Sequence, residues 1–128
     1  MKTYFTILAS LVALDAVWLG VITKSFYQKH LGHIFSGEFV VWPAAVFYFM
    51  YAFGVMYFVV NPALEAKSLH LALSRGAFLG LLAYATYDLT NQATLARWPT
   101  IITVADVAWG VLATALVSAI AYTVISKI

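Results

Sequence analysis

The chain has 128 residues, of which 64% are hydrophobic and 9% are charged, with no cysteine and a net charge of +2. A soluble domain of this size is excluded, because small domains leave too many residues at the surface to keep so much apolar side chain away from water. The small net charge, without basic runs, argues against a nucleic-acid partner, and the lack of cysteine excludes disulfides and thiolate chemistry. The composition predicts an integral membrane protein.

Four apolar segments follow one another along the chain, and each is close to the ~20 residues that a membrane-spanning helix needs. They predict helices at about 4–23, 40–60, 75–95 and 100–125. The segments are continuously apolar, whereas strands would alternate, and short connections make neighbouring helices antiparallel. The fold class predicted is therefore an all-α integral membrane protein, a four-transmembrane-helix bundle forming one membrane domain over residues 1–128.

The connection after the first segment predicts a further short helix at about residues 25–36. Tyr27, Leu31 and Phe35 fall on one side of such a helix, whereas Gln28 and Lys29 point away from it. An amphipathic helix of this kind is typical of a segment that lies in the plane of the membrane interface.

The remaining connections and the basic residues predict the topology. Asn61-Pro62 has the composition of a turn, and Pro99 suits the first turn of the last helix. Basic residues collect on the cytoplasmic side of a membrane protein. With cytoplasmic N- and C-termini, that side would hold Lys2, Lys67, Arg75 and Lys127 against Lys24, Lys29 and Arg97 on the other, which favours this orientation.

Three carboxylates, Asp15, Asp88 and Asp106, lie within the apolar segments. Each costs roughly 2.5–3.5 kcal/mol at a helix centre, and such residues usually mark functional sites. Counted from the helix ends they fall at one depth, which predicts a common pocket with an aromatic wall. The residues expected to bind a ligand there are Asp15, Asp88, Asp106, Tyr84, Tyr87, Asn91, Tyr48, Tyr51, Trp18 and Trp109. The alternative is that each carboxylate is structural and hydrogen-bonds the helices together.

Two weaker patterns concern metal binding and packing. His30 and His33 form an H-x-x-H pair that, with the carboxylates, could ligate a metal, although such pairs also arise by chance and interfacial histidines often meet only lipid head groups. Gly76-x-x-x-Gly80 allows close approach of another helix, either within the chain or in a homo-oligomer. Asp15-x-x-Trp18 recurs as Asp106-x-x-Trp109, without establishing an internal repeat.

Four motifs together resemble an uncharacterised family of small bacterial membrane proteins, domain of unknown function 2177. They are Asp15-x-x-Trp18, Trp42-Pro43-Ala44-Ala45-x-Phe47-Tyr48, Tyr84-Ala-Thr-Tyr87-Asp88-Leu-Thr-Asn91 and Asp106-x-x-Trp109-Gly110. The resemblance covers nearly the whole chain. It implies a four-helix, multi-pass protein of the bacterial inner (plasma) membrane, and it implies no activity.

The leading hypothesis is a membrane-embedded binding protein or accessory subunit that holds an amphipathic or lipid-like small molecule at the carboxylate cluster. One alternative is a metal-assisted lipid-modifying enzyme that uses His30 and His33. Another is an oligomeric proton-coupled transporter. The expected partners are membrane lipid, a second copy through Gly76 and Gly80, and a protein of lipid metabolism; no particular cofactor is indicated.

Overall fold

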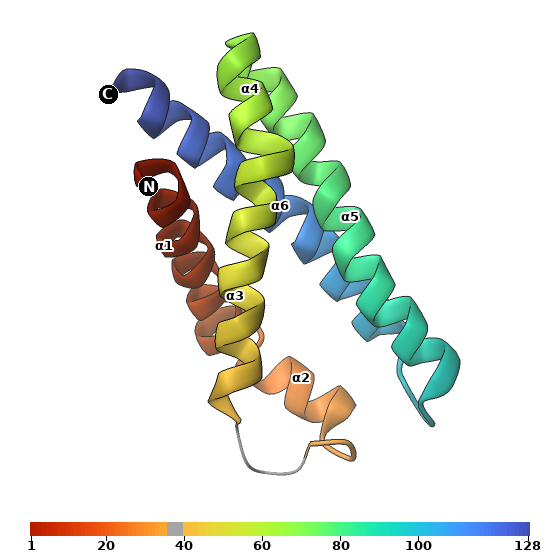
Figure 1. The fold of residues 1–128 in the computed structure, drawn as a ribbon. Coiled ribbons are helices and arrows are strands. Elements are labelled where there is room, and N and C mark those ends of the chain that lie inside the picture. Colours follow the sequence, from red (N-terminus) through yellow and green to blue (C-terminus); the bar gives the residue numbers. More distant parts are fainter. Residues whose placement is uncertain (36–39) are drawn as a thin grey trace.

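The structure, a computed structural model, describes residues 1–35 and 40–128, and all regular structure in these ranges is helical (Figure 1). The first helix consists of α1 (Lys2–Val17) and the π-helical η1 (Trp18–Ile22), and the short α2 (Lys24–Leu31) follows it. A long helix then runs through α3 (Val41–Val55), the π-helical η2 (Met56–Val60) and α4 (Asn61–Ala66). The last two helices are α5 (Leu69–Thr94) and α6 (Thr100–Lys127).

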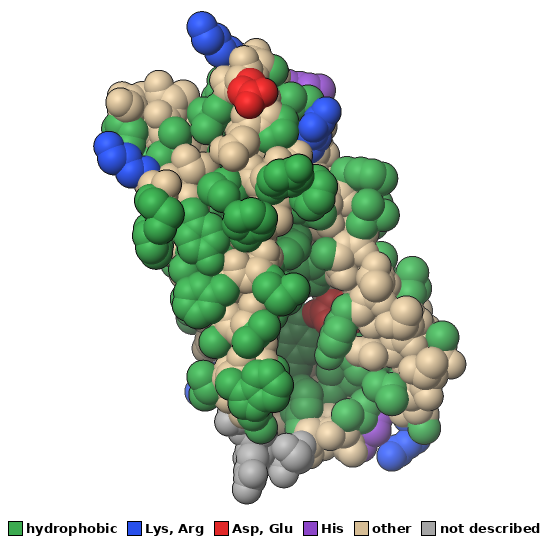
Figure 2. All heavy atoms as spheres, in the orientation of Figure 1, with side chains coloured by type: hydrophobic (Ala, Val, Ile, Leu, Met, Phe, Trp, Pro, Cys, Tyr) green, Lys and Arg blue, Asp and Glu red, His purple; other side chains and the backbone are tan. Residues whose placement is uncertain are grey.

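Three of these helices are long and apolar enough to cross a membrane, namely Lys2–Ile22, Val41–Ala66 and Thr100–Lys127. The fourth long helix, α5, is not among them, since polar residues collect at both of its ends. His70 and Arg75 lie near its start, and Asp88 begins a polar stretch near its end. Hydrophobic side chains cover the middle of the face shown in Figure 2, while most charged ones lie at its two ends. An apolar girdle of this kind is typical of a membrane protein.

The helices alternate in direction, as the sequence predicts for short connections. The two chain termini and the α4–α5 turn lie at one end of the molecule, whereas α2 and the α5–α6 connection lie at the other (Figure 1). Helix α6 packs most extensively against α5 and also against α1, and α1 in turn packs against α3. The long α3–η2–α4 helix meets α5 mainly through η2 and α4. Its α3 part therefore leaves space beside α5 near the α2 end.

The apolar core lies toward the end that holds the termini. Its fully buried members include Ile7 and Leu11 from α1, Val55 from α3 and Val117 from α6. The three carboxylates Asp15, Asp88 and Asp106 lie in the other half of the bundle, next to α2.

Helices α5 and α6 approach closely because glycines face each other across them. A Cβ added at Gly80 would lie 2.1 Å from the backbone oxygen of Gly110, and one added at Gly76 would lie 2.7 Å from Ser118 Oγ. The Gly-x-x-x-Gly pattern of α5 thus serves packing within the chain, the first of the two alternatives. Homo-oligomerisation through Gly76 and Gly80 stays a prediction.

Several predicted boundaries differ from the structure. The turn expected at Asn61-Pro62 is wrong, because the helix continues to Ala66 and turns at Lys67, which has a left-handed backbone (φ 53°). Pro62 is tolerated since it follows directly on η2, at the first turn of α4, where π-type hydrogen bonding changes to α-type.

Two other helices differ in length from their predictions. Helix α5 begins at Leu69 rather than near residue 75, because the Ser68 side chain accepts a hydrogen bond from the Leu71 N–H (3.0 Å) and caps it. The predicted helix at 25–36 ends earlier, at Leu31, and its last position, Ser36, lies outside the described residues.

Candidate functional site

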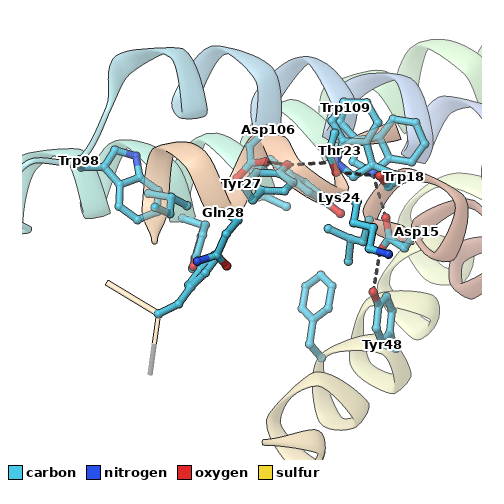
Figure 3. A pocket seen from close by; sticks show the side chains of 17 residues that line it. Asp15, Trp18, Thr23, Lys24, Tyr27, Gln28, Tyr48, Trp98, Asp106 and Trp109 are labelled. Atoms are coloured by element: carbon cyan, nitrogen blue, oxygen red, sulfur yellow. Dashed lines mark hydrogen bonds between the residues drawn. The ribbon is translucent and has the colours of Figure 1, made fainter. Parts of the chain in front are cut away.

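A pocket of about 630 Å³ lies in the space between α3 and α5, and it is walled by α1, η1, α2 and α6 as well. Figure 2 shows it as a hollow with an acidic side chain inside, and Figure 3 shows the side chains that line it. Nine of the 17 lining residues are aromatic. They are Trp18, Tyr27, Phe35, Phe47, Tyr48, Tyr84, Tyr87, Trp98 and Trp109. Two carboxylates, Asp15 and Asp106, lie among them.

Asp15 is held by donors from two other helices. The Tyr48 hydroxyl of α3 donates to its Oδ2 (2.7 Å), and the Trp109 indole N–H of α6 donates to its Oδ1 (2.9 Å). The side chain is only 7% exposed. Both carboxylate oxygens thus have a neutral partner, and the carboxylate joins α1, α3 and α6 at the wall of the pocket.

Asp106 is reached by a relay from the other side of the pocket. The Trp18 indole N–H donates to the Tyr27 hydroxyl (3.0 Å), which donates to Asp106 Oδ1. Burial, together with the hydrogen bond to Asp106, raises the pKa of Tyr27, so the phenol stays protonated and acts as a donor. The hydrogen bond from Tyr27 to Asp106 thus fixes the short helix α2 against α6.

The two Asp-x-x-Trp motifs are joined to each other by hydrogen bonds. Trp109 of the second motif binds Asp15 of the first, and Trp18 of the first reaches Asp106 of the second through Tyr27. The two indole rings stack with centroids 4.5 Å apart and planes inclined by 3°. Since α1 and α6 run in opposite directions, each Asp lies level with the other motif's Trp. The recurrence of Asp-x-x-Trp in the sequence therefore corresponds to a reciprocal contact between the two motifs in the structure.

Asp88 is in a different situation from the other two carboxylates. It is 0% exposed, and neither of its oxygens has a hydrogen-bond partner within the described ranges. Its carboxyl group lies within hydrogen-bonding reach of that of Asp106, and both groups are acceptors unless one carries a proton. Asp88 thus lies behind the wall of the pocket, in contact with the Asp that faces it.

The predicted site residues divide into two groups. Those that line the pocket are Asp15, Trp18, Tyr48, Tyr84, Tyr87, Asp106 and Trp109. The others are Asp88, Tyr51 and Asn91, which are not lining residues. The Tyr51 hydroxyl is instead paired with Thr114 Oγ1 (2.7 Å) on α6, and Asn91 is half-buried one turn beyond Tyr87.

Four lining residues from α2 were not among the predicted site residues: Lys24, Tyr27, Gln28 and Leu31. Figure 3 shows the Lys24 side chain extending into the pocket toward Asp15. The amphipathic pattern had placed Tyr27 on the apolar side of this helix, which was the available signal. That the helix folds back over the carboxylates could not be read from its pattern.

The two histidines take separate backbone partners. His30 Nδ1 pairs with the Phe26 carbonyl oxygen in its own helix (3.0 Å), and His33 Nε2 pairs with the Arg97 carbonyl oxygen (3.1 Å). Among the described residues no group of three or more His, Asp or Glu side chains is placed to hold a metal. The structure does not gather His30 and His33 with the carboxylates, and metal binding by them stays a prediction.

The helices and the pocket define a helical membrane protein with a polar, aromatic-lined cavity. A family model described as "Predicted membrane protein (DUF2177)" matches residues 1–123, and the chain belongs to this family. The resemblance inferred from the four motifs is thereby confirmed. Searches of curated proteins and of solved structures found no match to the chain.

Proposed function

We propose that this protein is a membrane-embedded binding protein, or an accessory subunit, that holds an amphipathic small molecule in the pocket between α3 and α5. The observation that carries the proposal is the combination of a cavity of about 630 Å³ with an aromatic lining and two convergent carboxylates. Small-molecule sites are usually concave and mostly apolar, with a few placed polar groups that fix orientation.

The position of the pocket supports an amphipathic ligand. Its polar groups, Asp15 and Asp106, lie inside, while apolar residues such as Leu19 and Phe47 line it nearer the exposed face of the bundle. Because α3 stands away from α5 next to α2, the hollow opens sideways between two helices whose outer faces are apolar (Figure 2). A lipid-like molecule could enter from the membrane with its tail outward.

Ligand binding in the pocket can be tested with a substitution that fills the cavity. Ala83 lines the cavity from α5, so an Ala83→Phe substitution is expected to occupy the space and abolish retention of a co-purifying molecule. Native mass spectrometry of the protein purified in mild detergent would detect that molecule as an added mass. Ala108→Phe makes the same change at an exposed position on α6 outside the pocket lining, and it should leave the added mass in place. Equal retention by both variants would contradict the proposal.

The proposal includes a fourth membrane span formed by α5. With 26 residues, α5 is about 39 Å long, enough to cross a hydrocarbon core of about 30 Å. Its Gly76 and Gly80 pack along α6, itself a candidate span, and Asp88 faces the protein interior. We therefore place the chain as four spans in a bacterial inner membrane, with both termini cytoplasmic and α2 at the opposite interface.

The absence of cysteine makes this topology directly testable. Glu65→Cys and Ala96→Cys introduce single thiols at exposed positions beyond the two ends of α5. In intact spheroplasts a membrane-impermeant maleimide is expected to label Ala96→Cys and to leave Glu65→Cys unlabelled until the membrane is permeabilised. Labelling of both from outside, or of neither, would mean that α5 does not span. Reversed labelling would invert the orientation.

A further inference from the structure

We infer that the ligand carries an ammonium group, and that this group binds at Asp106 between the aromatic walls of the pocket. The inference rests on the proposed function, because it names the head-group chemistry of the molecule that the same pocket would hold.

The charges of the pocket leave a negative site at Asp106. Asp15 has both oxygens occupied by Tyr48 and Trp109, and Lys24, the cationic side chain among the described lining residues, extends toward it (Figure 3). Asp106 has the Tyr27 hydroxyl as its donor and the carboxyl group of Asp88 beside it. Two adjacent buried carboxyl groups can share one proton, which leaves the pair with a single negative charge. One ammonium group would neutralise that charge.

The walls around this charge suit a cation. Tyr27, Tyr84, Tyr87 and Trp98 line the pocket together with Asp106, and the rings of Tyr87 and Trp98 meet edge to face with centroids 6.3 Å apart. Aromatic faces attract cations through the ring quadrupole, most strongly where water is excluded. An anionic head group would instead be repelled by the carboxylates, and an uncharged one would leave their charge unpaired.

The other lining residues suit an alkyl tail. Leu19, Leu31, Phe35 and Phe47 line the pocket without offering a side-chain hydrogen-bond partner. A single-chain alkylammonium molecule therefore matches the lining at both of its ends.

The tryptophans provide a local readout of binding. Trp18, Trp98 and Trp109 line the pocket, whereas Trp42 is 70% exposed and outside the lining, so it serves as an internal control. The protein would be produced with 5-fluorotryptophan in place of tryptophan and purified in dodecyl maltoside micelles. Its four ¹⁹F resonances would be assigned by single Trp→Phe substitutions. The probes are decyltrimethylammonium, decanoate and decanol, which share one chain length and differ in head-group charge.

Decyltrimethylammonium is expected to shift the Trp18, Trp98 and Trp109 resonances saturably, with an affinity about tenfold or more above that of decanol or decanoate. Asp106→Asn should remove this preference for the ammonium probe and leave decanol binding in place. Glu65→Gln is the same kind of change at an exposed position outside the pocket, and it should leave the preference unchanged. If the Asp106 variant does not fold, Tyr87→Leu offers a second test, since it removes an aromatic face and keeps the charge. Equal affinities for the three probes, or a preference for decanoate, would overturn the ammonium inference while leaving an amphiphile pocket. The lack of any saturable shift would overturn both proposals.

Discussion

Replacing Gly80 with alanine is expected to lower the free energy of unfolding by about 3 kcal/mol, the upper end of the typical cost of overpacking a core. The added Cβ would meet the Gly110 carbonyl oxygen at 2.1 Å, and this atom belongs to the backbone of α6. It cannot rotate away as a side chain does, so the two helices must separate. Reversible unfolding in mixed detergent micelles containing SDS, followed by circular dichroism, would measure the loss.

The same substitution at Gly54 is the matched control. Apart from its chain neighbours and the backbone of its own helix, no described atom lies within 4 Å of a Cβ added there, and Gly54 is also in a helix. Because alanine favours the helix over glycine by up to about 1 kcal/mol, Gly54→Ala should leave stability unchanged or raise it slightly. Similar effects of the two substitutions would show that α5 and α6 are not in close backbone contact at Gly80.

The substitution Asp15→Leu is expected to lower the free energy of unfolding by about 2 kcal/mol. It would leave the Tyr48 hydroxyl and the Trp109 indole N–H without their acceptor in the interior of the bundle. Each such donor costs about 1–3 kcal/mol in water-soluble proteins and less between membrane helices, where the unfolded state also finds partners. The same unfolding assay would measure it.

A substitution at Asp88 is expected to change stability in the opposite direction from the one at Asp15. Its oxygens have no donor among the described residues, so the only bond that Asp88→Asn can remove is the one made by a proton shared with Asp106, and the new amide N–H donates to Asp106 in its place without any proton being taken up. We expect Asp88→Asn to raise stability by about 1 kcal/mol. A residue that weakens the fold while lying beside a pocket is typical of a functional position. Destabilisation by both substitutions would instead favour a structural role for Asp15 and Asp88.

The convergence of Asp15 and Asp106 was predictable because a carboxylate in an apolar segment needs partners, and depth along a helix follows from counting residues. Helix rotation was less predictable. Tyr51 and Asn91 were expected on the pocket side, yet Tyr51 faces Thr114 and Asn91 lies beyond the lining. The facing of such side chains depends on how neighbouring helices pack, which a nearly uniform apolar pattern does not specify.

The α2 residues could not be assigned to the site for a related reason. The pattern of α2 describes an amphipathic helix, which could lie on a membrane surface or on protein. Only the tertiary contact from Tyr27 to Asp106, across 79 positions of the chain, places Tyr27 and Lys24 at the pocket. The turn expected at Pro62 was likewise wrong because the π-helical segment before it accommodates the proline.

The reciprocal contact between the first and last helices has a consequence for biogenesis. Asp15 and Trp109 are 94 positions apart, so at about 5–20 residues per second the ribosome needs roughly 5–20 s to supply the indole that binds the carboxylate. During that time α1 must enter the bilayer with a carboxylate that has at most one of its two partners, the Tyr48 hydroxyl, which follows 33 positions after it. We therefore expect insertion of α1 to be completed late, with the segment retained by the translocation machinery or near the bilayer surface until α6 emerges.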